Sequence, residues 1–133
     1  MTAELHRQYP AVVATAAHAR DDLAAFVRAH GHDALVPVAV LMVSELATNS
    51  ILHASGPITL RAQVDGRVLR VNVDDTDATL PAQRRPDGTG GRGLRIVAAL
   101  ATHWGAEVID GIGKTTWFTI ETDGTQNVER DRP

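Results

Sequence analysis

Cysteine is absent from the sequence. That absence excludes disulfides, thiolate nucleophiles and zinc sites built on cysteine. The six histidines are scattered along the chain, without the paired spacing of metal ligands. Neither sign of charge is in large excess, because 13 Lys and Arg residues against 16 Asp and Glu residues give a formal net charge of −3. This charge is too weak to indicate a nucleic-acid surface or a membrane surface, so we expect no direct binding to either.

From the first residues of the sequence we expect no secretion signal. Its first ten residues, MTAELHRQYP, have no basic start followed by an apolar run, which a secretion signal requires. We find no apolar stretch long enough to span a bilayer, and we expect a cytoplasmic protein. The length of 133 residues fits one compact domain. We expect that domain at residues 1–121, followed by a disordered polar tail at residues 122–133.

Apolar residues at helical spacing predict three helices. The first follows Pro10 and stops at Gly31, since glycine favours the end of a helix. The second runs from about Asp33, which can serve as its N-cap, to Ala54. The third lies in GLRIVAALATHWG, residues 93–105.

Two pairs of strands are predicted as well. ITLRAQV and VLRVNV alternate in side-chain character and flank Asp65-Gly66, a strong hairpin signal. AEVID and KTTWFTI form a closing pair, and a long polar loop at residues 74–92 separates the two pairs. Because elements of each kind are grouped along the chain, we predict an α+β fold, with a mixed or antiparallel sheet and helices on one face.

The second helix carries an acid and an amide in otherwise apolar surroundings. Glu45 and Asn49 are four residues apart in VSELATNS, so they share one face of the helix. Because this helix is apolar nearly all round, we expect it in the core, where an unpaired carboxylate is costly. The spacing alone leaves two explanations open, a ligand pocket or a structural ion pair or backbone cap.

A glycine-rich stretch precedes the third helix. In GTGGRGL, flexible backbone and the free N–H groups of a helix start could hold a phosphate. The glycines could equally serve only a tight loop and a helix cap. Gly88, Gly90 and Gly93 match the G-x-G-x-x-G pattern of dinucleotide-binding folds, but they follow a polar loop rather than a strand. We therefore reject that interpretation.

Three acids follow the strand VLRVNV. If its alternation continues, Asp75 points to the same buried side as Val71 and Val73, whereas Asp74 and Asp77 are expected in solvent. A buried aspartate can accept a hydrogen bond from an amino group of a ligand. The alternative is an Asx turn that ends the strand.

Taken in this order, SELATNSILHA, VNVDDTDATLP, GTGGRGLRIVAALATHWG and GKTTWFTI resemble the four sequence boxes of the GHKL ATPases. The similarity runs from about Asp33 to Ile120 and is greatest to the bacterial anti-sigma factor serine kinases and their small actinobacterial relatives. It implies a Bergerat-type two-layer sandwich within the α+β class. It also implies ATP or ADP with Mg²⁺ as ligands, and a homodimer.

The resemblance implies roles for individual residues. Asn49 would coordinate Mg²⁺, and Glu45 would be the general base. Asp75 would receive the adenine amino group, and Thr115 would help to seat the base. The residues implied to bind phosphate at the start of the third helix are Gly91, Arg92, Gly93 and Leu94.

One of the four boxes departs from the family pattern. DTDAT stands where the family has D-x-G-x-G, so Asp77 and Thr79 replace both glycines. The resemblance therefore leaves open the conformation beneath the adenine. Residues 76–90 would form a mobile lid over the ATP. His53 would either help near the phosphates or only pack the end of its helix.

Three functions are compatible with these motifs. The first is an ATP-dependent regulator that phosphorylates a serine on an anti-sigma factor antagonist and binds a sigma factor. The second is a module that holds ATP or ADP without catalysis and sequesters a protein partner. In the third, the glycines and the pair Glu45 and Asn49 are architecture only. The order of four motifs ranks the third function last, and the first rests on Glu45, Asn49 and the lid.

Overall fold

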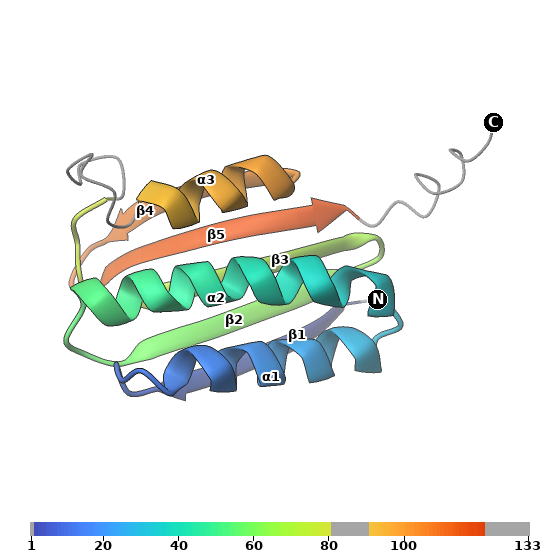
Figure 1. Ribbon diagram of the computed structural model, residues 1–133, viewed down its shortest axis with the longest axis horizontal. Coiled ribbons are helices and arrows are strands. Elements are labelled where there is room, and N and C mark those ends of the chain that lie inside the picture. The colour runs from blue at the N-terminus through green and yellow to red at the C-terminus, as the bar shows by residue number, and fades with distance from the viewer. Residues whose placement is uncertain (1, 81–90, 122–133) are drawn as a thin grey trace.

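The computed structural model describes residues 2–80 and 91–121, without the side chains of residues 91–93. Within these ranges the chain forms two layers, one of helices and one of strands (Figure 1). The elements in chain order are β1 Thr2–Tyr9, α1 Thr15–Ala29, the 3-10 turn η1 Asp33–Leu35, α2 Val36–His53, β2 Ile58–Asp65, β3 Val68–Asp75, α3 Gly91–Leu100, β4 His103–Ile109 and β5 Gly113–Glu121. The predicted tail at residues 122–133 lies outside the described residues.

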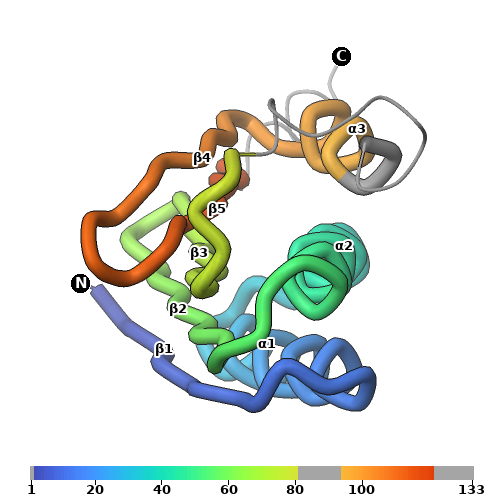
Figure 2. The backbone as a smooth tube through the Cα atoms, turned by 90° about the vertical axis from the view of Figure 1, so that its left-hand side faces the viewer, coloured from blue at the N-terminus to red at the C-terminus, as the bar shows by residue number. Residues whose placement is uncertain are grey.

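The strands form one sheet with the order β1-β2-β3-β5-β4, in which every neighbouring pair is antiparallel. The helices α1, α2 and α3 all cover the same face of this sheet (Figure 2). The predicted α+β fold with helices on one face is therefore confirmed, and of the two predicted sheet types the structure has the antiparallel one. The hairpin between β2 and β3 turns at Gly66, whose φ is +63°, as the Asp-Gly signal predicted.

Strand β1 is missing from the sequence-based prediction, which begins with a helix. β1 pairs with β2 from Thr2 opposite Asp65 to Tyr9 opposite Ile58. Of its eight residues, only Leu5 and Tyr9 are buried, because β1 is an edge strand with little core to cover. Two apolar positions are too few for alternation to indicate a strand.

Two predicted helix ends and one predicted N-cap are wrong. Helix α1 begins at Thr15, whose hydroxyl donates to the carbonyl oxygen of Pro10 at 2.6 Å. Asp33 does not cap α2, since it opens η1, and Leu35 occupies the cap position without a side-chain hydrogen bond. Helix α3 ends at Leu100, because the residues that follow pair with β5 as strand β4.

The core lies between the helical layer and the inner face of the sheet. Helix α2 crosses the middle of that face and contributes Ala39, Met42, Val43 and Leu46, each at most 2% exposed. The sheet contributes the inward positions of its central strands, among them Leu60, Ala62, Val71, Val73 and Phe118. Burial of one such aliphatic side chain stabilises the fold by about 1.5–3 kcal/mol. These contacts fix where α2 lies, and with it the residues Glu45 and Asn49.

The segment Asp33–His53, formed by η1 and α2, is long and apolar enough to cross a membrane by length and composition alone. This finding corrects the expectation that the sequence holds no such stretch. In the fold, α2 packs against the sheet and lies between α1 and α3 (Figure 1). Of its apolar 18-residue window, 44% is buried inside the structure, so core packing accounts for part of its apolar character.

Candidate functional site

Four elements meet at one end of the two layers, on the left in Figure 1. They are the C-terminal half of α2, the end of β3, the first turn of α3 and the start of β5. Helix α2 packs against both β3 and α3, and β3 pairs with β5. Segments that are far apart in the sequence therefore place their polar residues around one point.

Asn49 presents an unsatisfied acceptor at this end of α2. Its side chain is 9% exposed, and its amide oxygen Oδ1 has no hydrogen-bond partner in the described part of the chain. A buried polar atom without a partner costs about 1–3 kcal/mol and is uncommon in folded proteins. The oxygen is therefore available to a ligand, and a carboxamide oxygen is a suitable ligand for Mg²⁺.

Glu45 lies one turn before Asn49 on the same side of α2 and is half-buried rather than buried. The structural alternative weighed for it, an ion pair or a backbone cap, is not found among residues 2–80 and 91–121. Arg20, a cation of the neighbouring helix α1, donates instead to Ser44 Oγ at 3.2 Å. Glu45 is thus a half-buried acid without an ion pair in the described ranges.

Asp75 ends β3 on the inner face of the sheet, as its alternation predicted, and is 2% exposed. Ser50 of α2 donates its hydroxyl to Oδ2 at 2.5 Å, and the backbone N–H of Asp77 donates to Oδ1 at 2.9 Å. Lys114 of β5 donates to both carboxylate oxygens at 3.1 Å. An ionised carboxylate has about four lone-pair sites, and these four hydrogen bonds fill them.

Lys114 is the only lysine in the sequence, and it is 1% exposed. It lies directly opposite Asp75 in the register of β3 and β5. Gly113 permits this close approach, because a Cβ atom there would lie 2.0 Å from the carbonyl oxygen of Asp75. The ammonium group also lies 3.3 Å from the carbonyl oxygen of Asp77 and 3.9 Å from its Oδ2. A buried ion pair with this many hydrogen bonds is costly to break from one side only.

Asp77 and Thr79, which stand where the D-x-G-x-G pattern has glycines, take part in consecutive Asx turns. The N–H of Asp77 donates to the Asp75 side chain, and the N–H of Thr79 donates to Asp77 Oδ1 at 3.0 Å. Such bonds from a side chain to the backbone two residues on define a tight turn without glycine. The expectation that Asp77 lies in solvent is wrong, since its side chain is 17% exposed and faces Lys114.

Not all of the other predicted site residues lie on the same face of the sheet as Asp75. Thr115 lies on the outer face of the sheet, where its hydroxyl accepts from Asn72 Nδ2 at 2.9 Å, so it does not face Asp75. His53 is half-buried in the last turn of α2, and Leu94 is half-buried on α3. The backbone at the start of α3 is formed by Gly91, Arg92 and Gly93. Residues 81–90 of the predicted lid lie outside the described residues.

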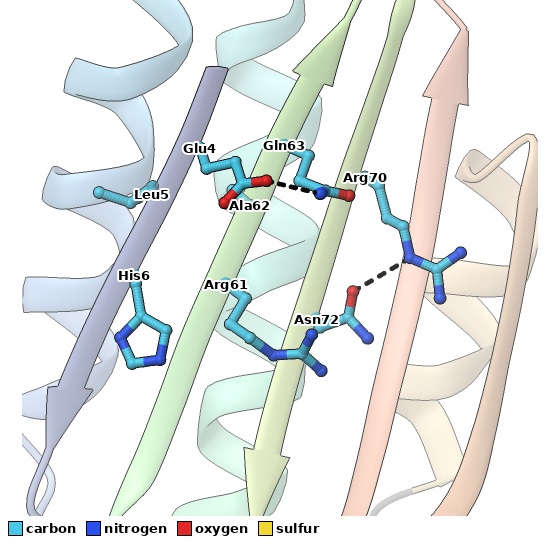
Figure 3. A pocket seen from close by; sticks show the side chains of 8 residues that line it. All are labelled: Glu4, Leu5, His6, Arg61, Ala62, Gln63, Arg70 and Asn72. Atoms are coloured by element: carbon cyan, nitrogen blue, oxygen red, sulfur yellow. Dashed lines mark hydrogen bonds between the residues drawn. The ribbon is translucent and has the colours of Figure 1, made fainter. Parts of the chain in front are cut away.

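The outer face carries a separate polar cluster (Figure 3). Arg61 donates to Asp74 at 2.8 and 2.9 Å, and these hydrogen bonds raise the pKa of Arg61; Asp74, expected in solvent, is therefore paired. Arg70 donates to Asn72 Oδ1 at 3.1 Å and lies 4.3 Å from the centre of the Trp117 ring. The cavity beside them measures about 100 Å³, whereas small-molecule sites usually measure roughly 300 Å³ or more. This cavity is too small for a nucleotide.

The site on the inner face of the sheet suits the phosphate end of a magnesium nucleotide better than its base end. No cluster of three His, Cys, Asp or Glu residues in the described ranges could hold a metal by itself. Asn49 Oδ1 can nevertheless supply one oxygen where phosphates and water supply the others, and the first N–H groups of α3 have no partners within the helix. At the base end, Asp75 has no free lone pair for an adenine amino group while Lys114 holds both its oxygens.

Sequence reasoning missed Ser50 and Lys114. Ser50 gives no signal of its own, because it is only the neighbour of Asn49. Lys114 gives two signals, since it is the sole lysine and shares the inward alternation of β5 with Thr116 and Phe118. Neither signal identifies Asp75 as its partner, which depends on the register of β3 against β5.

Comparison with known proteins adds one result. The family model of the histidine kinase-like ATPase domain matches residues 9–120. That range covers well over half of the chain and runs from the end of β1 almost to the end of β5. No curated protein matches the chain.

Proposed function

The chain belongs to the family of histidine kinase-like ATPase domains, and we propose that it is a cytoplasmic regulatory protein that binds ATP or ADP with Mg²⁺. The observation that carries the proposal is the buried Asn49 Oδ1, which has no hydrogen-bond partner among the described residues. Asn49 belongs to the C-terminal half of α2, the helix that packs against α3. Asn49 would then hold the metal ion, and the start of α3 would hold the phosphates that the same metal ion binds.

Individual residues divide the binding of a nucleotide between them. Asn49 Oδ1 would hold the metal, and the N–H groups at the start of α3, from Gly91 to Leu94, would bind phosphate oxygens. When bound, the nucleotide would supply the transferable phosphoryl group, and Mg²⁺ would neutralise part of the charge of that group. Asp75 would recognise the base through its carboxylate once one of the donors that now fill its lone pairs has left.

We further propose that the protein is a serine kinase. Glu45 lies one turn from Asn49, and its half-buried carboxylate has no partner in the described ranges. It is free to accept the proton of a serine hydroxyl and to orient its oxygen. The resemblance of four ordered boxes supports an anti-sigma factor antagonist as the acceptor, a sigma factor as a second partner and a homodimer as the assembly.

Calorimetric titration with ADP tests the binding site. We expect the wild type to bind ADP in a Mg²⁺-dependent manner, and Asn49→Ala to lose about ten-fold or more of that affinity because one metal ligand is removed. Thr48→Ala is the matched control, since Thr48 is the preceding residue of the same helix but is exposed. Equal affinities of the wild type and Asn49→Ala would contradict the role of Asn49, and absence of Mg²⁺-dependent binding would contradict the proposed ligand.

Transfer of labelled phosphate from ATP to the serine of a candidate antagonist tests the kinase. Glu45→Gln keeps the size of the side chain but removes its ability to accept a proton. We expect this variant to keep its ADP affinity and to transfer phosphate about 10²–10⁴ times more slowly. If nucleotide binds but no transfer occurs in either protein, the function is the alternative one, a binding module that uses ATP or ADP as a conformational ligand.

A further inference from the structure

We infer that Lys114 competes with the nucleotide for Asp75, so that the free protein fills its base-binding position with its own ammonium group. This inference rests on the proposed function, because it takes Asp75 as the acceptor for an adenine amino group. It deepens that function by naming the residue that sets the nucleotide affinity.

The first step is the occupancy of Asp75. Its Oδ1 accepts from the Asp77 N–H and from Lys114, and its Oδ2 accepts from Ser50 and from Lys114. An exocyclic amino group is a donor and needs a lone pair on the same carboxylate. Binding of adenine at Asp75 therefore requires that one of these donors leave.

Lys114 is the donor best able to leave. The Asp77 N–H belongs to a backbone turn, and Ser50 sits on a short side chain in the helix α2 that the core holds in place. Lys114 has a four-carbon stem with rotatable bonds. A neutral amino group can replace its hydrogen bonds but not its charge, so displacement opposes binding and lowers the apparent affinity.

Lys114 also connects the base position with the residues after β3. Its ammonium group contacts both the carbonyl oxygen and Oδ2 of Asp77, and Asp77 in turn accepts from the N–H of Thr79. Movement of the Lys114 ammonium group away from both Asp75 and Asp77 therefore removes a restraint on the two consecutive turns. Nucleotide binding and the conformation of residues 77–79 are coupled through this side chain, in addition to the hydrogen bond from the Asp77 N–H to Asp75.

Titration of ADP and GDP against Lys114→Met tests the competition. Met keeps a long apolar stem and removes the ammonium group, so we expect this variant to bind ADP about ten-fold or more tightly than the wild type does, the order expected for hydrogen bonds to a charged group. Arg70→Met is the matched control, because it removes a long cation from the outer face of β3, away from Asp75. We expect it to leave the ADP affinity unchanged.

The outcomes separate this inference from the proposed function. Mg²⁺-dependent ADP binding by the wild type with no gain in folded Lys114→Met would overturn the inference and leave the proposed function standing. Binding only by Lys114→Met would support the competition at Asp75 but overturn the proposed binding of ADP by the wild type. No binding by either protein would overturn both. Tighter binding of GDP than of ADP by the wild type would also overturn the inference, because Lys114 would then donate to a base carbonyl oxygen rather than compete with the base.

A measurement on the wild type covers the case in which Lys114→Met does not fold, since it leaves the buried Asp75 without its counter-ion. Because the chain has one lysine, acylation of its side-chain amine can be followed by mass spectrometry, with a lysine-containing peptide in the same tube as reference for the reagent. We expect slow labelling of Lys114 in the free protein and faster labelling at saturating ADP and Mg²⁺. An unchanged labelling rate, with ADP bound, would overturn the inference.

Discussion

Asn49 and Asp75 are buried acceptors at the same end of the fold, but their surroundings are opposite. Asp75 receives four hydrogen bonds, whereas Asn49 Oδ1 receives none from the described residues. The free energy cost of about 1–3 kcal/mol for such an oxygen is typical of a position kept for a ligand rather than for stability. The residue types of the site were predictable from the sequence. The state of each acceptor was not, because it depends on which donors the fold brings near.

Gly113 is the residue on which the contact between Lys114 and Asp75 depends most directly. Its φ is +148°, and a Cβ atom there would lie 2.0 Å from the carbonyl oxygen of Asp75. We expect Gly113→Ala to lower the free energy of unfolding by roughly 3 kcal/mol or more, because strand β5 must move away from β3. Chemical denaturation measures this change.

Gly111→Ala is the control for that experiment. Gly111 also has a positive φ, +78°, but an added Cβ would meet nothing within 4 Å. Only backbone strain should remain, at about 1–2 kcal/mol. Equal losses of stability in the two variants would contradict the view that close packing of β5 on Asp75, rather than the turn conformation, requires glycine at position 113.

Among the elements, those with two independent sequence signals were predicted well. The hairpin of β2 and β3 combines alternation with an Asp-Gly turn, and α2 combines an apolar surface with the stop at Gly56-Pro57. Strand β1 has only two buried residues and no turn signal, so local pattern could not reveal it. Its pairing with β2 joins residues that are distant in the sequence, which tertiary context decides.

The boundary between α3 and β4 shows the same limitation. The residues after Leu100 contain no helix breaker before Gly105, so helical spacing extended the predicted helix too far. In the structure, Thr102 N–H donates to the carbonyl oxygen of Thr119 in β5, and His103 begins the strand. Pairing with a strand that follows later in the chain therefore ends the helix, and no residue near Leu100 indicates this pairing.

In the whole molecule, the site lies where the two layers are joined by side chains. The helical layer supplies Asn49 and Ser50, and the sheet supplies Asp75 and Lys114. The hydrogen bond from Ser50 to Asp75 links the layers at the site. A second link lies at the β1 edge of the sheet, where the Tyr9 hydroxyl of β1 donates to Asp22 Oδ2 of α1 at 2.5 Å.

The Tyr9 link predicts how the stability of the whole fold depends on alkaline pH. Tyr9 is the only tyrosine of the chain, and burial, followed by the hydrogen bond to Asp22, raises its pKa far above the usual range. Folding thus favours the protonated phenol. The resulting stabilisation is complete below the unfolded-state pKa of about 10 and is lost as the pH rises above it.

We expect the free energy of unfolding to fall more steeply above pH ~10 in the wild type than in Tyr9→Phe, which has no phenol to ionise. Urea denaturation at a series of pH values measures the two slopes, and the absorbance of tyrosinate reports the ionisation of the single tyrosine. Below that pH, the variant should be less stable by about 1 kcal/mol, through the loss of one hydrogen bond. Parallel pH profiles of the two proteins would mean that the bond from Tyr9 to Asp22 does not hold the edge strand to the helical layer.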